Sequence, residues 1–284
     1  MSRIVTLGLV QMSMSEEREE NLSKALAMIE EASSKGAQIV CLPELFATRY
    51  FPQTKNSNLA PENIPGPTTK FLSQAAKKNE IVLVGGSIFE IDGEKKYNTS
   101  VVFDARGHML GKYRKVHIPQ DESFYEQDYF SPGDSYPTFK TAHGRIGALI
   151  CFDQWYPEPA RVERLEGAEV LFYPTAIGAA KGIEQTEGNW QQAWEAVQRG
   201  HAVANSMIVT AVNRVGREGE MRFWGGSFIY DQFGKLLARA GSSEEVLAVE
   251  CDLSLQENVE KGWGFLRNRA PGSYSEISAS GRKR

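Results

Sequence analysis

Three residues with reactive side chains each come directly after a strand-like run. Glu44 follows the apolar run 39–42, Cys151 follows the apolar run 146–150, and Lys115 follows a predicted hairpin. In open α/β proteins, reactive groups gather where strands end and loops begin. A thiol, a carboxylate and an ammonium can together carry out nucleophilic catalysis at a carbonyl carbon. Each of the three alone, however, also has an ordinary structural interpretation.

Cys151 is the strongest candidate nucleophile. It leaves an apolar strand and enters a turn before a helix predicted to begin at Pro157, so its side chain would stand clear of the sheet. Because the thiolate is the reactive form, such a thiol needs a base and a positive neighbour. Taken alone, a buried small hydrophobe is the favoured interpretation of Cys151, as it is of Cys41 and Cys251.

Glu44 and Lys115 are the candidates for that base and that positive charge. A carboxylate near a thiol can take its proton and return it to a leaving amine. A fixed ammonium can stabilise the oxyanion of a tetrahedral intermediate, together with the backbone N–H of Phe152. Alone, Glu44 is typical of an exposed loop acid, and Lys115 of a solvated surface charge.

The elements that must position these residues alternate along the chain. Strands are predicted at 4–10, 39–42, 81–84, 99–103, 109–113, 146–150, 170–173 and 207–212, with an antiparallel finish at 225–230, 235–238 and 246–250. Amphipathic helices are predicted before Gly36, from Pro67, from Pro157 and over 189–205, the last with Trp190, Ala193, Trp194 and Val197 on its inner face. This alternation favours α/β layers with a mixed sheet, and no linker divides the chain.

Composition narrows the class of protein. The 284 residues carry 32 Lys+Arg against 36 Asp+Glu, and this net charge of −4 argues against a nucleic-acid binder. No apolar stretch approaches the ~20 residues that span a bilayer, so no membrane contact is expected. The start runs straight into a strand pattern without a secretory signal, and three widely spaced cysteines make no disulfide framework. We therefore expect a cytoplasmic protein.

Other catalytic chemistries lack their motifs. The four histidines show no His-Glu-x-x-His spacing, and there is no Cys-x-x-Cys pair, so neither a metal nor another cofactor is expected. His117 is interpreted as a local hydrogen-bonding residue and His201 as a core or interface residue. The pairs Gly85-Gly86 and Gly225-Gly226 lack phosphate-loop spacing, and the Gly-x-Ser-x-Gly elbow of serine hydrolases is absent.

Taken together, three segments resemble the motifs of the nitrilase superfamily of carbon–nitrogen hydrolases. They are Leu42-Pro43-Glu44, Tyr113-Arg114-Lys115-Val116-His117 and Ile150-Cys151-Phe152-Asp153, and their order and separations also match. The resemblance implies a four-layer α-β-β-α sandwich with mixed sheets, forming one hydrolase domain over 1–284 with a C-terminal tail from about 252. It also implies Glu44 as base, Cys151 as nucleophile of a thioester intermediate, Lys115 as oxyanion stabiliser, and Glu126 as a second catalytic glutamate.

Within that superfamily the chain resembles N-carbamoylputrescine amidases, which act in polyamine biosynthesis and yield putrescine, carbon dioxide and ammonia. The supporting runs are 115–119, 129–134, 151–158 and 173–178. By analogy, Tyr50, Phe152 and Trp155 would contact the substrate, and the carbonyl of Ala176 would face the ureido group. Core or interface packing is an equally good interpretation of Tyr50 and Trp155.

The loop 179–189 departs from that subfamily. It is short, and Lys181 stands near where an acid usually follows Gly178 to hold the distal ammonium of the substrate. Glu184 or Glu187 can supply the carboxylate instead, although a solvated loop acid is the simpler interpretation of each. A carbamoylated amine therefore stays a hypothesis for the small-molecule substrate.

Several alternatives stay open. The substrate can be a ureido acid or an ω-amide, as in β-ureidopropionase-like and ω-amidase-like relatives. The fold can also serve as a non-catalytic interaction module, or Cys151 as a redox-sensing thiol. The resemblance further implies a homodimer or higher homo-oligomer, with Trp190, Trp194 and the stretch 263–274 as candidate contacts.

Overall fold

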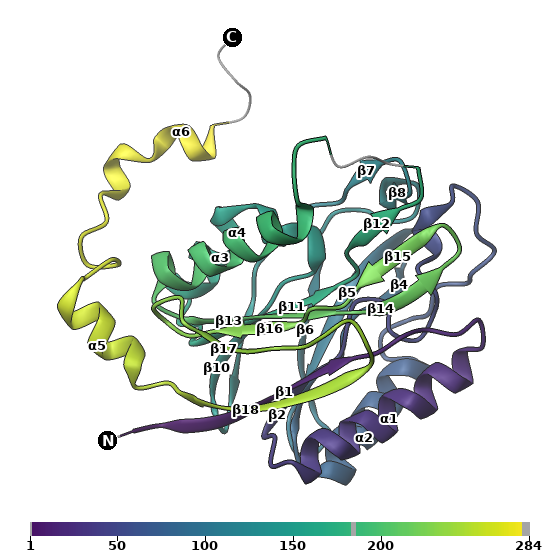
Figure 1. The fold of residues 1–284 in the computed structure, drawn as a ribbon, viewed down its shortest axis with the longest axis horizontal. Helices are drawn as coiled ribbons and strands as arrows, with labels where there is room; N and C mark the ends of the chain where they lie inside the picture. Colours follow the sequence, from purple (N-terminus) through teal and green to yellow (C-terminus); the bar gives the residue numbers. More distant parts are fainter. Residues whose placement is uncertain (1, 183–185, 280–284) are drawn as a thin grey trace.

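Two β-sheets pack face to face in this computed structural model, which describes residues 2–182 and 186–279 (Figure 1). Helices α1 (Arg18–Ser34) and α2 (Pro67–Asn79) cover the outer face of one sheet. Helices α3 (Pro157–Leu165) and α4 (Trp190–Asn205) cover the outer face of the other. The arrangement confirms the predicted four-layer α-β-β-α sandwich.

The first sheet has seven strands. Its order is β18 (Glu245–Asp252), β1 (Ile4–Gln11), β2 (Ile39–Cys41), β3 (Val82–Val84), β5 (Lys95–Phe103) and β4 (Ile88–Asp92), with β6 (Met109–Arg114) also paired to β5. Strands β1, β2 and β3 run parallel and the others are antiparallel, so the sheet is mixed. The β5–β6 hairpin turns at the predicted place, 105–107.

The second sheet has six strands and is mixed as well. Its order is β17 (Leu236–Arg239), β16 (Phe228–Tyr230), β13 (Ile208–Asn213), β11 (Val170–Thr175), β10 (Gly144–Ala148) and β9 (Thr138–Thr141), with β10, β11 and β13 parallel. Two small sheets lie beyond it. They are β12 (Gly178–Ala180) with β15 (Met221–Trp224) and β14 (Val215–Glu218), and the hairpin β7 (Gln120–Asp121) and β8 (Phe124–Tyr125).

Three apolar layers hold the four structural layers together. Along β1, Leu7 and Leu9 point into the core between the sheets, whereas Val10 points into the core under α1 and α2. Along β11, Phe172 faces the inter-sheet core and Tyr173 faces α3 and α4. Because both faces of the central strands are buried, these strands read in the sequence as continuous apolar runs.

The structure differs from the sequence-based predictions of its elements in three respects. Segment 246–250 does not extend the 225–238 meander, because β18 pairs with β1 in the other sheet. Strand β4 and the β12–β15–β14 sheet were not predicted at all. The buried face of α4 is also rotated from the predicted one. It carries Trp194, Gln198, His201, Ala202 and Asn205, whereas Ala193 is exposed.

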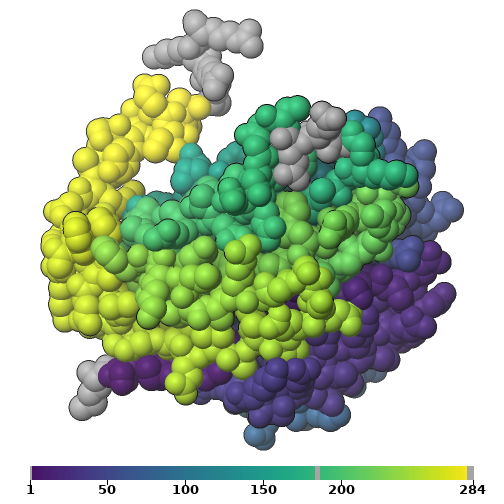
Figure 2. All heavy atoms as spheres, viewed as in Figure 1, coloured from purple at the N-terminus to yellow at the C-terminus, as the bar shows by residue number. Residues whose placement is uncertain are grey.

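The C-terminal segment after β18 carries α5 (Leu255–Gly262) and α6 (Ser275–Ser278). It runs along one side of the molecule and leaves a hollow between itself and α3 and α4 (Figure 2). The basic stretch 281–284 lies outside the described residues. Over the described part of the chain, no helix combines the length and apolar composition that crossing a membrane requires.

Candidate active site

Glu44 lies on a buried turn just past the end of β2. Its side chain is fully buried, and Asn98 on β5 donates a hydrogen bond of 2.7 Å to its Oε1. The turn is held from behind, since Arg214 donates to the carbonyl oxygens of Glu44 and Leu45 at 2.6 and 3.0 Å. Glu44 Oε2 has no hydrogen-bond partner within the described part of the chain. One carboxylate oxygen is therefore anchored and the other is available.

Lys115 joins two buried carboxylates. It follows β6, and its Nζ lies 2.9 Å from Glu44 Oε1 and 2.6 Å from Glu126 Oε2. Burial acts to lower the pKa of the Lys115 ammonium, but Glu126 and Glu44 outweigh it, so this pKa is raised. Lys115 therefore stays charged although it is fully buried.

Glu126 is the second carboxylate, on a 3₁₀ turn, Glu126–Asp128, that follows β8. Tyr50 donates its hydroxyl to Glu126 Oε1 at 2.8 Å. Burial raises the pKa of Glu126 to about 7, and the nearby charge of Glu44 adds to this while Lys115 opposes it. One ammonium faces two carboxylates here, so a proton on Glu126 near neutral pH relieves the excess negative charge.

Cys151 lies beside this group on a backbone that bends in the left-handed sense. Its φ is +43°, in a region that costs a residue with a side chain ~1–2 kcal/mol. Burial raises the pKa of the Cys151 thiol, as does Glu44, whereas Lys115 and a backbone hydrogen bond with Ala176 lower it. The resting group is therefore a neutral thiol within electrostatic range of Glu44, Lys115 and Glu126.

Asp153 ties the Cys151 turn to the segment that carries Lys115. Its Oδ2 accepts hydrogen bonds from Tyr113 Oη at 2.7 Å and Ile150 N at 3.0 Å. Its Oδ1 accepts from His117 N at 3.0 Å and lies 2.8 Å from His117 Nδ1. The predicted local role of His117 is therefore confirmed, and one buried carboxylate fixes two of the strand ends relative to each other.

Cys151 opens into a cavity of about 520 Å³. Its walls come from the stretches 118–127, 151–156 and 176–178, and from Trp190 and Ala193 at the start of α4. Phe152, Trp155 and Ala176 line this cavity, as the sequence predicts, and Glu126 reaches it too. The cavity lies at the carboxyl ends of β10 and β11, where open α/β sheets usually bind ligands.

Two predicted substrate-binding residues do not line the cavity. Tyr50 is fully buried between the rings of Phe124 and Phe223, and its hydroxyl is used by Glu126. Glu187 is exposed, and its carboxylate accepts a hydrogen bond of 3.1 Å from the indole of Trp190, which does line the cavity. Glu184 lies outside the described residues.

The remaining sequence candidates have structural roles. Cys41 and Cys251 are free thiols buried in the core between the sheets. His201 is buried on α4, where its Nε2 lies 2.8 Å from the carbonyl oxygen of Gln154. Trp194 is also fully buried, with its indole donating to Gln154 Oε1 at 2.8 Å, so the prediction that it forms a subunit contact is wrong.

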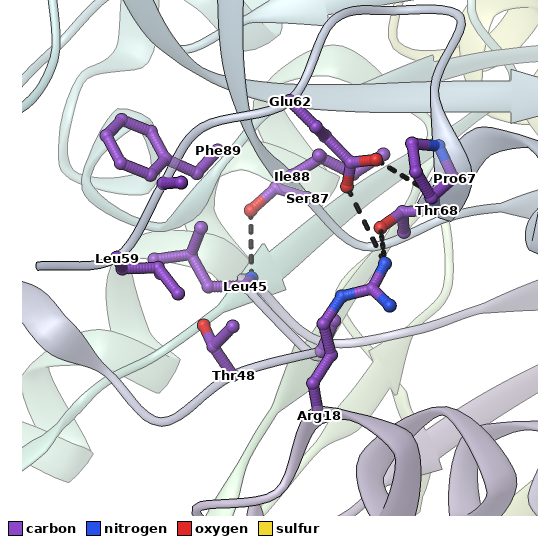
Figure 3. A pocket seen from close by; sticks show the side chains of 12 residues that line it. Arg18, Leu45, Thr48, Leu59, Glu62, Pro67, Thr68, Ser87, Ile88 and Phe89 are labelled. Carbon is purple, nitrogen blue, oxygen red and sulfur yellow. Dashed lines mark hydrogen bonds and ion pairs between the residues drawn. The ribbon is translucent and has the colours of Figure 1, made fainter.

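A second cavity, of about 190 Å³, lies behind the Glu44 turn (Figure 3). Leu45 and Ser87 form part of its wall, and Leu45 N donates to Ser87 Oγ at 2.9 Å. Its charged lining residues, Arg18 and Glu62, face each other at 4.0 Å, and both bond to Thr68. This cavity does not reach Cys151, and its charges are already paired.

Sequence reasoning missed Asn98 and Arg214, and it did not see the structural roles of Asp153 and Gln154. Asn98 lies in the middle of a strand, where a polar side chain gives no sign of the carboxylate it faces. Arg214 pairs with Glu218 at 2.8 Å, and both are buried. Asp153 and Gln154 stand inside the cysteine motif, so their nearness to Cys151 was the available signal.

The sequence matches a family model for carbon–nitrogen hydrolases over residues 6–261. The chain belongs to the carbon–nitrogen hydrolase family. This membership of the nitrilase superfamily confirms the predicted resemblance, and it makes the chain an enzyme-family member that acts on C–N bonds of amides or related compounds.

Relatives of this hydrolase differ in their substrates. The N-carbamoylputrescine amidase of Solanum lycopersicum is 38% identical over 288 residues, which cover 97% of this chain and 95% of the relative. A citrullinase of Francisella tularensis is 37% identical over 282 residues, covering 96% of this chain and 98% of the relative. The crystal structure of a carbon–nitrogen hydrolase from Helicobacter pylori G27 superposes with a TM-score of 0.91 at 36% identity, covering 97% and 99% of the two chains.

Proposed function

We propose that this hydrolase cleaves N-carbamoylputrescine to putrescine, carbon dioxide and ammonia, with Cys151 as nucleophile. The observation that carries the proposal is the shared Lys115 ammonium, which joins Glu44 to Glu126 within electrostatic range of the Cys151 thiol. Glu126 and Cys151 line a cavity of about 520 Å³. A binding module has no need of all three buried charges, which are costly to bury. The arrangement therefore supports an enzyme over an interaction module with a vestigial thiol.

The proposed reaction begins with proton transfer from Cys151 to Glu44. The raised pKa of the thiol means that it needs this base, and Glu44 Oε2 has no other partner among the described residues. The sulfur attacks the ureido carbon, while Lys115 and the backbone N–H of Phe152 stabilise the oxyanion. Glu44 then gives its proton to the departing amine, which leaves a carbamoyl thioester on Cys151.

Water completes the turnover. It attacks the carbamoyl thioester, the thiol is restored, and the released carbamate decomposes to carbon dioxide and ammonia. We assign Glu126 to holding the Lys115 ammonium and to balancing its charge, because it contacts Lys115 at 2.6 Å and reaches the cavity wall. The atoms balance with one water consumed for each ureido bond cleaved.

The substrate assignment draws on the relatives and on the cavity. The similarity to N-carbamoylputrescine amidases supports a carbamoylated amine, and Phe152, Trp155 and Ala176 are placed to contact its ureido end. The similarity to a citrullinase supports a second candidate, a ureido amino acid. Both compounds carry the same ureido group, so the mechanism is common to them.

Ammonia release from a panel of substrates tests this proposal. The panel contains N-carbamoylputrescine, citrulline, a β-ureido acid and an ω-amide, with Cys151→Ala as the inactive control. We expect the highest kcat/KM on N-carbamoylputrescine, and no ammonia from any compound would support the interaction module instead. Rapid peroxide oxidation of Cys151 without hydrolysis would support a redox sensor.

Single-turnover kinetics test the role of Glu44. After rapid mixing with substrate, mass spectrometry follows the carbamoyl adduct of roughly 43 Da on Cys151. Glu44→Gln should slow its formation by roughly 10²–10⁴-fold, the usual contribution of a general base. Acylation at the wild-type rate would remove Glu44 from the proposed mechanism.

We also propose that residues 1–284 form one hydrolase domain that works as a homodimer in the cytoplasm. The pairing of β18 with β1 supports one domain, and three free cysteines support a reducing compartment. Exposed apolar side chains support self-association, with Leu165 on α3, Trp263 and Ile277 at 48%, 61% and 63% exposure. Light scattering should give twice the mass of the chain, and a monomer would contradict the dimer.

A further inference from the structure

The mouth of the active-site cavity carries a negative charge, and no cation lines the cavity in the part of the chain that the structure describes. Of the described residues that line the cavity, Asp121 and Glu126 are acids, and none is Lys, Arg or His. Glu126 is already used by Lys115 and Tyr50 at the floor. Asp121 is therefore the lining charge left to meet a substrate.

Asp121 is placed by a short, well-held hairpin. It ends β7, and the β7–β8 turn contains Ser123 with a φ of +65°. Gln127 braces the hairpin, since its backbone N–H donates to Gln120 Oε1 at 3.1 Å and its side chain donates to the carbonyl oxygen of Ile118 at 3.0 Å. In Figure 1, β7 and β8 stand beside β12. All three strands contribute residues to the lining of the cavity.

The carboxylate of Asp121 keeps capacity for a ligand. Its Oδ1 accepts one hydrogen bond of 2.8 Å from the backbone of Glu122, next to it in the turn. Among residues 2–182 and 186–279, no Lys, Arg or His lies within ion-pair distance of Asp121, and Lys181 is instead 3.5 Å from Glu220. A carboxylate accepts several hydrogen bonds, so Asp121 can still bind a cationic group.

The wall across the cavity suits the same kind of ligand. Trp155, Tyr156 and Trp190 supply aromatic surface, which packs against methylene groups and attracts cations to the ring faces. A distal carboxylate would instead meet Asp121 with no compensating cation, and such like-charge contact is unfavourable. The lining therefore separates two classes of ureido compound by the charge of their far end.

We propose that Asp121 selects substrates whose distal end is a cation and rejects those whose distal end is a carboxylate. This inference rests on the proposed function and deepens it, because it names the residue that distinguishes monocarbamoylated diamines from ureido acids. Asp121 is a specificity residue and takes no part in bond cleavage. Citrulline carries both an ammonium and a carboxylate at its distal end, so it falls between these two classes of substrate.

Three ureas of similar length test the proposal. N-carbamoylputrescine ends in an ammonium, butylurea in a methyl group and 4-ureidobutyrate in a carboxylate. KM and kcat are measured for wild type, Asp121→Asn and Asp121→Lys, and Glu122→Gln serves as the control because it is the adjacent acid of the same turn and does not line the cavity. Calorimetry with Cys151→Ala, with and without Asp121→Asn, measures binding of the same compounds without turnover.

In wild type we expect kcat/KM to fall in the order ammonium, methyl, carboxylate. Asp121→Asn should raise KM for N-carbamoylputrescine roughly 5- to 20-fold, an effect between those of losing an exposed ion pair and a charged hydrogen bond. It should leave kcat for N-carbamoylputrescine, and both KM and kcat for butylurea, unchanged. Asp121→Lys should favour 4-ureidobutyrate over N-carbamoylputrescine. Adding 0.5 M salt should shrink the wild-type discrimination, because Asp121 is exposed to screening.

The possible failures are distinguishable. If Asp121→Asn matches wild type on N-carbamoylputrescine, or changes all three ureas equally, Asp121 does not select the charge, while the hydrolase function stands. If wild type hydrolyses none of the three ureas, the proposed function fails and this inference fails with it.

Discussion

The floor and the mouth of the active-site cavity are built in opposite ways. At the floor, Glu126 lines the cavity and is joined through Lys115 to Glu44, and all three side chains are at most 1% exposed. At the mouth, Asp121 is exposed on a short hairpin, and Glu187 is exposed on a loop outside the cavity lining. The floor thus holds its charges in fixed geometry, whereas the mouth presents them to solvent.

This difference separates the reaction from the choice of substrate. Relatives with almost the same identity to this chain are named for different ureido compounds, N-carbamoylputrescine and citrulline. A buried, mutually bonded charge cluster tolerates little change, because removing one partner leaves an uncompensated buried charge. Exposed residues on hairpins and loops can change with small cost to stability, so specificity can vary there.

The largest effect is expected at the floor, from Cys151→Ala. Without the sulfur no thioester forms, so kcat/KM should fall by at least ~10⁴-fold, the order seen when a catalytic nucleophile is removed. Cys251→Ala is the matched control, because Cys251 is a buried thiol in the inter-sheet core and does not reach the cavity. Steady-state kinetics measure both, and more than about 1% residual activity in purified Cys151→Ala would contradict a nucleophilic role.

Asp153→Asn should have the next largest effect, although Asp153 lies behind the floor. The amide replaces one acceptor with a donor, so two of the bonds to Tyr113, Ile150 and His117 are lost. We expect a loss of ~2–4 kcal/mol in the free energy of unfolding and a roughly tenfold fall in kcat with little change in KM. Asp128→Asn, the same substitution at a different aspartate, is the control for both the stability and the kcat measurements. A fall in stability with kcat unchanged would make Asp153 purely structural.

Glu126→Gln should change how stability depends on pH. The pKa of Glu126 is about 7 in the folded protein and near 4.5 for the free side chain, so between these values the folded state holds a proton that the unfolded state has lost. The free energy of unfolding should therefore fall as pH rises from 4.5 to 7, by up to ~1.4 kcal/mol per pH unit. Denaturant titrations should show this fall in wild type and its loss in Glu126→Gln.

If the free energy of unfolding of Glu126→Gln still falls with pH at the wild-type slope, the proton is bound by another group. Glu122→Gln serves as the control, because Glu122 is exposed and should leave the wild-type slope in place.

The smallest effect is expected outside the cavity lining, from Glu187→Gln. Its carboxylate is exposed and bonds to the Trp190 indole outside the cavity lining, so KM for N-carbamoylputrescine should change less than about twofold. Measuring the change in KM for Asp121→Asn under the same conditions shows which of the two carboxylates binds the cation. A larger effect of Glu187→Gln than of Asp121→Asn would move the cation site to the 179–189 loop.

The layers and the floor of the site were largely predictable from the sequence. Continuous apolar runs such as 39–42 and 146–150 report strands buried on both faces, and parallel strands bring their carboxyl ends to one edge. Glu44 and Lys115 follow strands of the first sheet, whereas Cys151 follows a strand of the second. Their approach therefore depends on how the two sheets pack, which the resemblance implied and the strand pattern alone did not.

The remaining features depend on long-range pairing or on buried polar groups. Nothing local in 245–252 shows that β18 pairs with β1 rather than with its neighbours in sequence. The buried face of α4 was predicted wrongly because Gln198 and His201, which face the core, are satisfied by Gln154. Buried polar residues of this kind do not contribute to the apolar periodicity from which the buried face of a helix is predicted. Asn98 escaped prediction for the same reason.

The left-handed turns in this fold have a consequence for its history. Leu45, next to Glu44, and Cys151 adopt φ values of +48° and +43°, where glycine alone is unstrained. If turnover were no longer selected, glycine at position 151 would relieve that strain and increase stability, so drift would tend to erase the thiol. Under the proposed function, the cysteine side chain is therefore kept in this unfavourable backbone conformation for its chemistry.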